Sequence, residues 1–454
     1  MKFKRSTLKA YAWVFAIAGA VFVFASGPLM ELINLYGAAL PGARPLSGAD
    51  ASLWLALTGS MMAMITYLAV VLARDTEDDV AWNALLLSKG LSSALCVFFA
   101  VSLGNTLFLL GTLIDGPIFL HLLFLRYHGA VRATDRDAWR ARFKNGMEKF
   151  YEVWFLKFND PVHGHAFWVR YTILKTATRQ VASCWWVFFD GDGSPPILGR
   201  QDLALEEVDF GQNGRVWSHR ACNLSDTSAD AKFTQASWDL SWQSAGAAPH
   251  YFIPRILCAL GIAKSQYCAP MPLGYFDGHI DIGGRKIEVK QAFGSVGHIW
   301  GTAMADNWRW AHALLKTDDA KESVVFEVLS AQAKIGPIKT PRMTFAYLWH
   351  DGKFHATPSV RGALVSRTQA AASGWDFSAD LGDVVVSGDC RPDPLQSVVL
   401  EYDDTAGKKL RCDNSKTGTL GLHMKSKKGV FLGAWESGGS AAVETVVTLA
   451  QGVD

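Results

Sequence analysis

Two histidines, three tryptophans and one carboxylate crowd into the sixteen residues 297–312. If this segment is a strand, its side chains alternate between two faces. One face then carries Asp306, Trp308, Trp310 and His312. An acid beside indole faces can protonate an apolar alkene, and the indoles can stabilise the cation that forms. Two other interpretations stay open: a half-buried strand whose indole N–H groups find local partners, and a helix.

The length and composition indicate several domains and a part that lies in a membrane. A chain of 454 residues is too long for one compact core. Half of its residues are hydrophobic, and the excess lies before residue 127. The net charge of only +2 predicts no general attraction to nucleic acid.

The seven cysteines form no CxxC pair, and their number is odd. This pattern is typical of neither a disulfide framework nor a zinc site, and scattered reduced thiols suit the cytoplasm. The sequence also lacks a Gly-rich phosphate loop, a dinucleotide fingerprint, an HExxH motif and a GxSxG elbow. We therefore expect neither a cofactor nor a metal.

Four apolar stretches precede residue 127, and each is close to the ~20 residues that cross a hydrocarbon core as a helix. They are residues 11–36, 52–73, 81–103 and 105–126. We therefore predict a four-helix transmembrane bundle over residues 1–126. Basic residues precede the first stretch and follow the fourth, whereas the loop after the first holds only Arg44. The positive-inside rule then predicts a multi-pass protein of the inner membrane, with its N-terminus and all later residues in the cytoplasm.

Two charges lie within these stretches, Lys89 in the third and Asp115 in the fourth. The two helices run antiparallel, and the depths of the two residues differ by roughly 6 Å at 1.5 Å per residue. Because an unpaired charge there is costly, we predict a Lys89–Asp115 pair that faces the bundle interior. It is either a proton or ligand site that also includes His121, or a structural pair that fixes the register of the helices.

Residues 127–147 are basic, with Trp139 and Phe143 interspersed. This pattern predicts a short interfacial linker that contacts anionic lipid headgroups. A solvated linker is the alternative.

After residue 148 the pattern becomes that of short strands separated by turns, which favours sandwiches or closed barrels. We predict one barrel over 148–270 and a second over 271–454, the second opened by a hairpin at 275–291 around Gly283-Gly284. In the first of these barrels, Glu152 and Arg170 are expected to pair in the interior if both of their strand faces point inward.

Several of these residues resemble a two-domain lipocalin-like family. It includes tocopherol-cyclase-like proteins, acyclic carotenoid hydratases (hydroxyneurosporene synthases) and fungal cyclases for Diels–Alder reactions. The resemblance covers roughly 148–454 and rests on Glu152–Pro161, Ala166–Thr172, Phe276-Asp277-Gly278, Gly297-His298-Ile299-Trp300-Gly301 and the following Trp308, Trp310 and His312. Ile299 stands where the family often has Asn, and the helical segment at the front is not part of its usual core.

The resemblance implies two lipocalin-like barrels that meet in a cleft for long isoprenoid or polyketide chains. It implies cofactor-free chemistry: hydration or cyclisation started by a proton, or a pericyclic ring closure. The family's signature positions in this chain are His298, Trp300, Gly301, Trp308, Trp310 and His312. We add Asp306 on chemical grounds: Asp306 or His312 is the expected acid, Trp308 and Trp310 stabilise the cation, and His298 and Trp300 shape the pocket. Further candidates for contact with the substrate are Glu152, Trp154, Trp168 and Arg170.

We therefore expect a membrane-anchored protein that binds membrane lipids and an apolar isoprenoid or polyene ligand. Cyclase or hydratase activity, of the lyase or isomerase type, refines that expectation. Two alternatives have no catalytic role: a carrier of an apolar ligand, and a structural membrane protein whose barrels dock a partner.

Overall fold

A computed structural model describes residues 2–45, 51–74, 78–128, 135–144, 146–211, 215–254, 257–258, 263–316, 323–335, 338–350 and 352–449. The chain divides into two compact units, Met1–Val131 and Arg132–Asp454.

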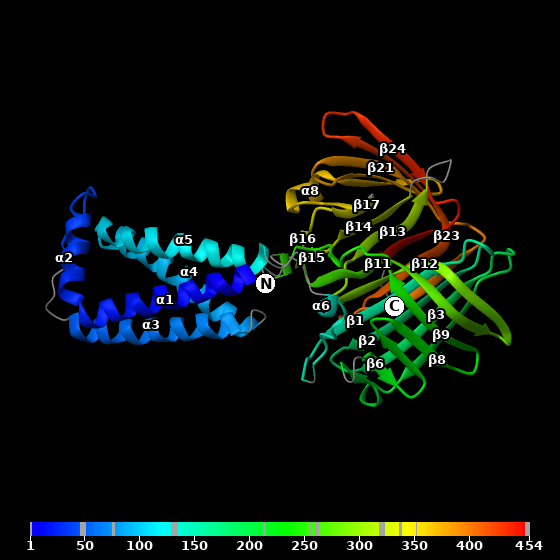
Figure 1. Cartoon of the computed structure of the whole chain (residues 1–454), viewed down its shortest axis with the longest axis horizontal. Coiled ribbons are helices and arrows are strands. Elements are labelled where there is room, and N and C mark those ends of the chain that lie inside the picture. Colours follow the sequence, from blue (N-terminus) through cyan, green and yellow to red (C-terminus); the bar gives the residue numbers. More distant parts are fainter. Residues whose placement is uncertain are drawn as a thin grey trace, which may run out of the picture. The chain divides into compact units, whose positions relative to one another are not determined.

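The first unit is helical. Its elements are α1 (Lys2–Phe24), α2 (Ser26–Gly37), α3 (Ala51–Arg74), α4 (Asp79–Ser102), a 3-10 turn (Thr106–Phe108) and α5 (Leu109–His128). Helices α1, α3, α4 and α5 contribute to one apolar core, and α2 crosses at one end of them (Figure 1). The predicted helix at 11–36 is in fact two, because the backbone turns at Ala25.

Three of these helices are long and apolar enough to span a membrane: Ser6–Phe24, Val80–Ser102 and Thr106–Arg126. Thr58–Arg74 is a shorter apolar helix. Large apolar side chains cover the outside of this unit, among them Trp13, Phe24 and Leu87, and outward-facing apolar side chains are what lipid contact requires.

The predicted ion pair between Lys89 and Asp115 is confirmed. Lys89 Nζ lies 2.9 Å from Asp115 Oδ1, and Ser92 Oγ donates to Asp115 Oδ2 at 2.6 Å. The ammonium also lies 4.9 Å from the centre of the Phe15 ring. The pair therefore ties α4 to α5 and contacts α1, while its role remains a prediction.

The second unit holds two curled antiparallel sheets (Figure 1). The first has the order β4-β3-β2-β1-β12-β11-β9-β8-β7-β6-β5, with β10 on β11. Its strands are β1 (Phe150–Asn159), β2 (Ala166–Lys175), β3 (Gln180–Phe189), β4 (Ile197–Leu203), β5 (Asp209–Phe210), β6 (Arg215–His219), β7 (Cys222–Ser225), β8 (Ser228–Lys232), β9 (Ala236–Ser244), β10 (His250–Tyr251), β11 (Ser265–Ile282) and β12 (Arg285–Gly301).

The second sheet has the order β18-β17-β14-β13-β24-β23-β21-β20-β19, with β22 on β23 and β25 on both β13 and β23. Its strands are β13 (Asn307–Lys316), β14 (Ser323–Gln332), β17 (Met343–His350), β18 (Lys353–Ala356), β19 (Arg367–Ala371), β20 (Gly374–Asp380), β21 (Val384–Arg391), β22 (Ser397–Asp403), β23 (Lys409–Ser426), β24 (Phe431–Glu436) and β25 (Ala441–Thr448). The remaining elements are α6 (Asp135–Trp139), a 3-10 turn (Leu205–Glu207), the β15–β16 ribbon (Lys334–Ile335 and Ile338–Lys339) and α8 (Val360–Val365).

The hairpin around Gly283-Gly284 forms as predicted, but its placement in the second set of strands is wrong. It joins β11 to β12, and β12 pairs along β1, with Trp300 opposite Glu152 and Gly294 opposite Phe158. The hairpin is therefore part of the first sheet. Pairing between segments so far apart in the chain leaves no local trace in the sequence.

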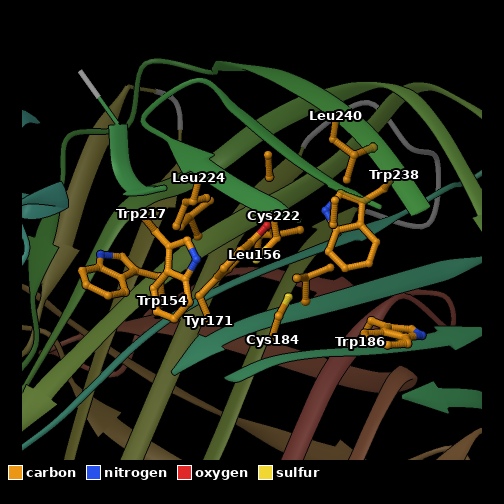
Figure 2. Close-up of a cluster of buried hydrophobic side chains, with 14 of the residues drawn as sticks. Trp154, Leu156, Tyr171, Cys184, Trp186, Trp217, Cys222, Leu224, Trp238 and Leu240 are labelled. Carbon is orange, nitrogen blue, oxygen red and sulfur yellow. The ribbon is translucent and has the colours of Figure 1, made fainter. Parts of the chain in front are cut away.

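Strand β1 is buried on both faces. Trp154 and Leu156 point into the core that the first sheet encloses, where Figure 2 shows them among Tyr171 and Trp217. Val153 and Phe155 point the other way, into an apolar layer shared with residues of the second sheet. The two sheets therefore pack face to face through this layer.

The described part of the predicted interfacial linker packs into the β unit instead. Trp139 is buried and stacks on Trp242, with ring centres 6.2 Å apart, and Phe143 packs against Phe150 and Phe210. The linker prediction is therefore wrong for 135–144, because Trp139 and Phe143 bury their apolar surface against residues of the first sheet. Residues 129–134 and 145 lie outside the described residues.

Candidate active site between the two sheets

Two adjoining cavities lie between the sheets. The inner cavity has a volume of about 110 Å³, and the outer cavity has a volume of about 800 Å³. The seven residues that line both are Ile253, Ser265, Met304, Ala305, Trp308, Leu329 and Ala331. Together the two cavities have the size of a site for a lipid-sized molecule.

The inner cavity has aromatic walls from both sheets. Trp168 comes from β2, Trp308 and Trp310 come from β13, and Tyr402 comes from β22. Trp308 stacks on Tyr402 with ring centres 6.5 Å apart, and Trp310 meets Phe155 edge to face at 5.4 Å. The prediction of a strand with Trp308 and Trp310 on one face is confirmed, since they stand opposite Ala331 and Leu329 of β14.

A carboxylate that the sequence analysis missed, Glu444, lines the inner cavity beside Trp310. Its Oε1 accepts from Lys416 Nζ at 2.7 Å and from Asn414 Nδ2 at 3.0 Å. Oε2 has no hydrogen-bond partner within the described ranges. Lys416 is fully buried, with its ammonium 5.6 Å and 5.1 Å from the ring centres of Trp168 and Trp310. An oriented carboxylate with one uncommitted oxygen can accept or donate a proton.

A second buried carboxylate, Glu327, holds the back of the aromatic wall in place. It accepts hydrogen bonds from Trp310 Nε1 at 2.7 Å, from Tyr347 OH at 2.6 Å and from Tyr267 OH. Burial raises the pKa of Glu327 above its ordinary value, and the three donors oppose that shift. Burial and the adjacent Glu327 hold the pKa of the Tyr267 hydroxyl well above its ordinary value, so this hydroxyl remains protonated.

A buried lysine, Lys157, lies next to these groups, and Asn159 of the same strand joins the two sheets. Burial, and then the nearby charge of Lys416, lower the pKa of Lys157 to about 7. Its Nζ donates to Asn159 Oδ1 at 3.0 Å, and Asn159 Nδ2 donates to the Lys416 carbonyl at 2.7 Å. Neither lysine was identified from the sequence, because a lysine in an alternating strand is normally taken as exposed.

The predicted acid Asp306 lines the outer cavity rather than the inner one. It precedes β13, and its Oδ1 lies 2.9 Å from Lys408 Nζ. The other predicted acid, His312, lines neither cavity and is fully buried, with Nε2 2.8 Å from the Pro272 carbonyl. Burial and Lys157 hold the pKa of His312 well below its ordinary value. The neutral ring uses its one N–H on that carbonyl, so His312 does not meet the requirements of an acid.

His298 and the neighbouring predicted residues lie away from both cavities. His298 is fully buried, its Nδ1 lies 2.8 Å from the Ala138 carbonyl, and its Nε2 lies 2.8 Å from Glu152 Oε1. The ring is therefore held on both sides, by a backbone carbonyl and by the Glu152 carboxylate. Trp154 and Trp300 flank this ring at 4.6 Å and 4.5 Å. His298 and its three neighbours are part of the core and its rim. The geometry therefore supports neither the catalytic role predicted for His298 nor the ligand contacts predicted for Glu152, Trp154 and Trp300.

The predicted Glu152–Arg170 pair is wrong. The Glu152 carboxylate also accepts from the backbone N–H groups of Arg142 and Phe143, at 2.7 Å and 2.8 Å. Arg170 stands opposite Phe155 and therefore on the other face of the sheet, where it lines the inner cavity. Parity within one strand could not show this, because both faces of β1 are buried.

No protein-family model matches the chain. Two uncharacterized proteins of Mycobacterium tuberculosis, from strains CDC 1551 / Oshkosh and ATCC 25618 / H37Rv, are each 25% identical over 309 residues, which cover 67% of this chain and 90% of theirs. Among solved structures, CghA with Sch210972 is 13% identical with a TM-score of 0.46, covering 67% of this chain and 90% of that one. Kievitone hydratase from Nectria haematococca is 11% identical with a TM-score of 0.40, covering 71% and 95%. Values of this size assign no activity to the chain.

Within the described ranges, no group of three or more His, Cys, Asp or Glu side chains is arranged to hold a metal ion. The carboxylate and the aromatic rings that line the inner cavity are groups that can support proton transfer.

Proposed function

We propose that the two cavities bind a long apolar molecule of the isoprenoid or polyene type, and that the protein acts on it as a cofactor-free hydratase or cyclase. The observation that carries the proposal is the uncommitted oxygen of Glu444 on the wall of a cavity lined by aromatic rings. A largely apolar pocket with a few placed polar groups is the usual form of a small-molecule site. The signature residues that resemble carotenoid hydratases and tocopherol-cyclase-like proteins agree with this substrate class.

The proposed reaction begins with a proton from Glu444. The Lys416 ammonium, which donates to Glu444 Oε1 at 2.7 Å, supplies this proton to the carboxyl group. The O–H bond breaks as a C–H bond forms at one end of an alkene, and a cation is left at the other end. The faces of Trp168, Trp308 and Trp310 stabilise that cation. Attack by water, or by a second alkene of the same chain, and loss of a proton to the carboxylate complete hydration or cyclisation.

The helical unit supports a membrane source for the substrate. Three of its helices have the length and apolar composition of membrane spans. We propose that they anchor the protein in the cytoplasmic membrane, with the N-terminus and the β unit in the cytoplasm. An anchor of this kind keeps the enzyme next to a substrate that is insoluble in water.

The experiment follows deuterium from solvent into product. Full-length protein in detergent is incubated in D₂O with the isoprenoid extract of its host's membranes, and the lipids are analysed by mass spectrometry. We expect a hydrated or cyclised product with one non-exchangeable deuteron on carbon. Glu444→Gln should abolish that product while changing ligand affinity by less than about threefold.

Asp306→Asn is the matched control, since Asp306 is the ion-paired carboxylate of the outer cavity. This variant should retain the labelled product. Loss of the product in Asp306→Asn alone would move the proton donor to the outer cavity. Bound lipid without any labelled product would favour a carrier.

A non-catalytic carrier is the second candidate, and one observation favours it. The acids and histidines first predicted for catalysis are all engaged, Asp306 by Lys408, His298 by Glu152 and His312 by a backbone carbonyl. A carrier needs no free acid, so it predicts normal ligand loading in Glu444→Gln and no product in the wild type.

A further inference from the structure

Arg170 is a buried arginine in the inner cavity without a charged partner. The residue is only 6% exposed and lines the inner cavity. Its guanidinium carbon lies 3.9 Å from the centre of the Tyr402 ring and 5.9 Å from that of Trp185. Among the residues that the structure describes, none forms a hydrogen bond or an ion pair with it.

The buried carboxylates near this cavity are engaged by groups other than Arg170, Glu444 by Lys416 and Glu327 by Trp310 and two tyrosine hydroxyls. Lys416 and Glu444 neutralise each other at 2.7 Å. Arg170 is the other charge on the wall of the inner cavity, and its contacts are with aromatic rings. A buried guanidinium normally has an anion or several acceptors, because loss of hydration costs several kcal/mol. The position of Arg170 therefore implies that an acceptor arrives with the ligand.

We propose that the inner cavity binds the carboxylate end of a mostly apolar acid, with the carboxylate on the Arg170 guanidinium and the chain extending past Trp308 into the outer cavity. This inference rests on the proposed function and adds the charge of the substrate to it. The planar guanidinium can bind both oxygens of a carboxylate at once, and the low dielectric of the cavity strengthens the contact. The small inner cavity fits the carboxylate and the alkene carbons next to it, where Glu444 lies, and the larger outer cavity fits the rest of the chain.

The test compares an acid with its neutral ester on the full-length protein in detergent at pH 8. The probes are cis-parinaric acid and its methyl ester, and binding is read as energy transfer from tryptophan to the polyene, with empty micelles as background. We expect the acid to bind about tenfold or more tightly than the ester, the range of a hydrogen bond to a charged group. Equal affinities would overturn the inference while leaving the proposed function intact. Failure of both probes to bind would overturn the proposed function itself.

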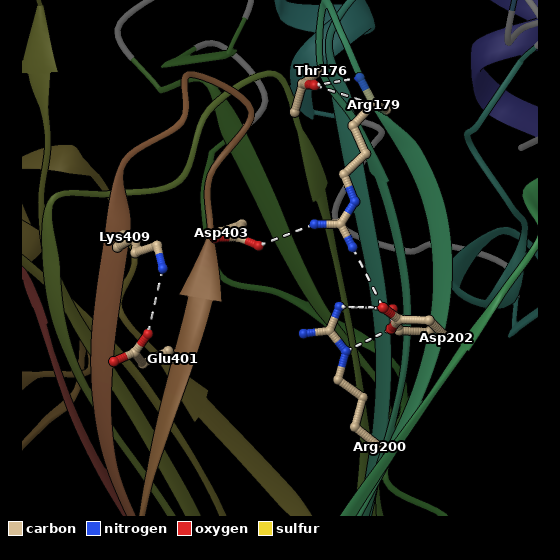
Figure 3. Close-up of polar contacts among 8 residues, drawn as sticks. Thr176, Arg179, Arg200, Asp202, Glu401, Asp403 and Lys409 are labelled. Carbon is tan, nitrogen blue, oxygen red and sulfur yellow. Dashed lines mark hydrogen bonds and ion pairs between the residues drawn. The ribbon is translucent and has the colours of Figure 1, made fainter.

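Variants then locate the preference. Arg170→Gln should bind the acid and the ester with nearly equal affinity, and its affinity for the ester should equal that of the wild type. Arg170→Lys retains the charge and should keep part of the preference for the acid. Arg200→Gln is the matched control, since Arg200 also lies over Trp185, at 4.3 Å, but is paired with Asp202 at 2.6 Å (Figure 3). A preference that persists in Arg170→Gln, or disappears in Arg200→Gln, would refute the assignment.

Discussion

Replacing Lys157 by methionine should change how the stability of the β unit depends on pH. In the native state the pKa of this ammonium is about 7, against an ordinary value of 10.5, because the side chain is fully buried and lies near Lys416. Above pH 7 the native protein therefore releases a proton that the unfolded chain still holds. Stability rises with pH wherever the unfolded state binds more protons, by about 1.4 kcal/mol per pH unit for one proton. The methionine variant lacks this contribution.

The magnitude follows from the pH interval. Between pH 6 and pH 8.5 the free energy of unfolding of the wild type should rise by about 2 kcal/mol relative to that of Lys157→Met. The rise accumulates over the 1.5 pH units of this interval that lie above the native pKa. The comparison with the variant is essential, because burial also raises the pKa of thiols such as Cys268 in both proteins. That shift lowers stability as pH rises through the thiol range, and it cancels in the difference.

The assay is denaturant unfolding of the full-length proteins in detergent, followed by tryptophan fluorescence. Fourteen of the seventeen tryptophans lie beyond residue 131, so the signal reports mainly on the β unit. Lys290→Met is the matched control, because Lys290 is a largely exposed lysine of the same sheet. The difference in the free energy of unfolding between Lys290→Met and the wild type should not change with pH. A difference between the wild type and Lys157→Met that stays constant within about 0.5 kcal/mol would refute the reasoning.

Three further predictions concern other parts of the chain. Glu152→Gln should lower the free energy of unfolding by about 2–4 kcal/mol, since the amide cannot accept from both backbone N–H groups and His298; a loss below about 1 kcal/mol in denaturant unfolding would contradict this. Trp308→Ala should weaken the binding of cis-parinaric acid methyl ester about tenfold or more, measured by energy transfer, because this ring lines both cavities. Unchanged affinity would show that the ligand binds outside the two cavities. Lys89→Met should destabilise the helical unit more than the double variant Lys89→Met/Asp115→Asn does, because the single change leaves the Asp115 carboxylate without its ion-pair partner. Thermal melting measures both variants, and additive effects of the two substitutions would exclude coupling of the pair.

The proposed chemistry depends on how the two sheets meet more than on any single motif. Glu444 stands beside Trp310 through the pairing of β25 with β13, and Arg170 reaches the same cavity from β2 of the other sheet. A change that shifts this packing would therefore separate the proposed proton donor from the proposed binding site for the carboxylate.

The sequence alone determined the features that depend on local periodicity. The alternation of Trp308 and Trp310 predicted a strand with one aromatic face, and β13 has that face. The spacing of apolar stretches predicted long helices before residue 127, and the positions of Lys89 and Asp115 within them predicted their ion pair. Such patterns can be read from sequence because neighbours in one helix or strand are set by backbone geometry.

Only the tertiary structure decided which faces meet. The alternation in β1 gives two sets of side chains but cannot say which set faces the core of the first sheet and which faces the other sheet, since both are buried. Glu152 and Arg170 were therefore paired wrongly, and the hairpin before residue 291 was placed in the wrong sheet. Glu444, Lys157 and Lys416 look like ordinary surface charges in the sequence. Their burial follows from contacts between segments up to 257 residues apart, and such contacts depend on the packing of whole sheets rather than on any local pattern.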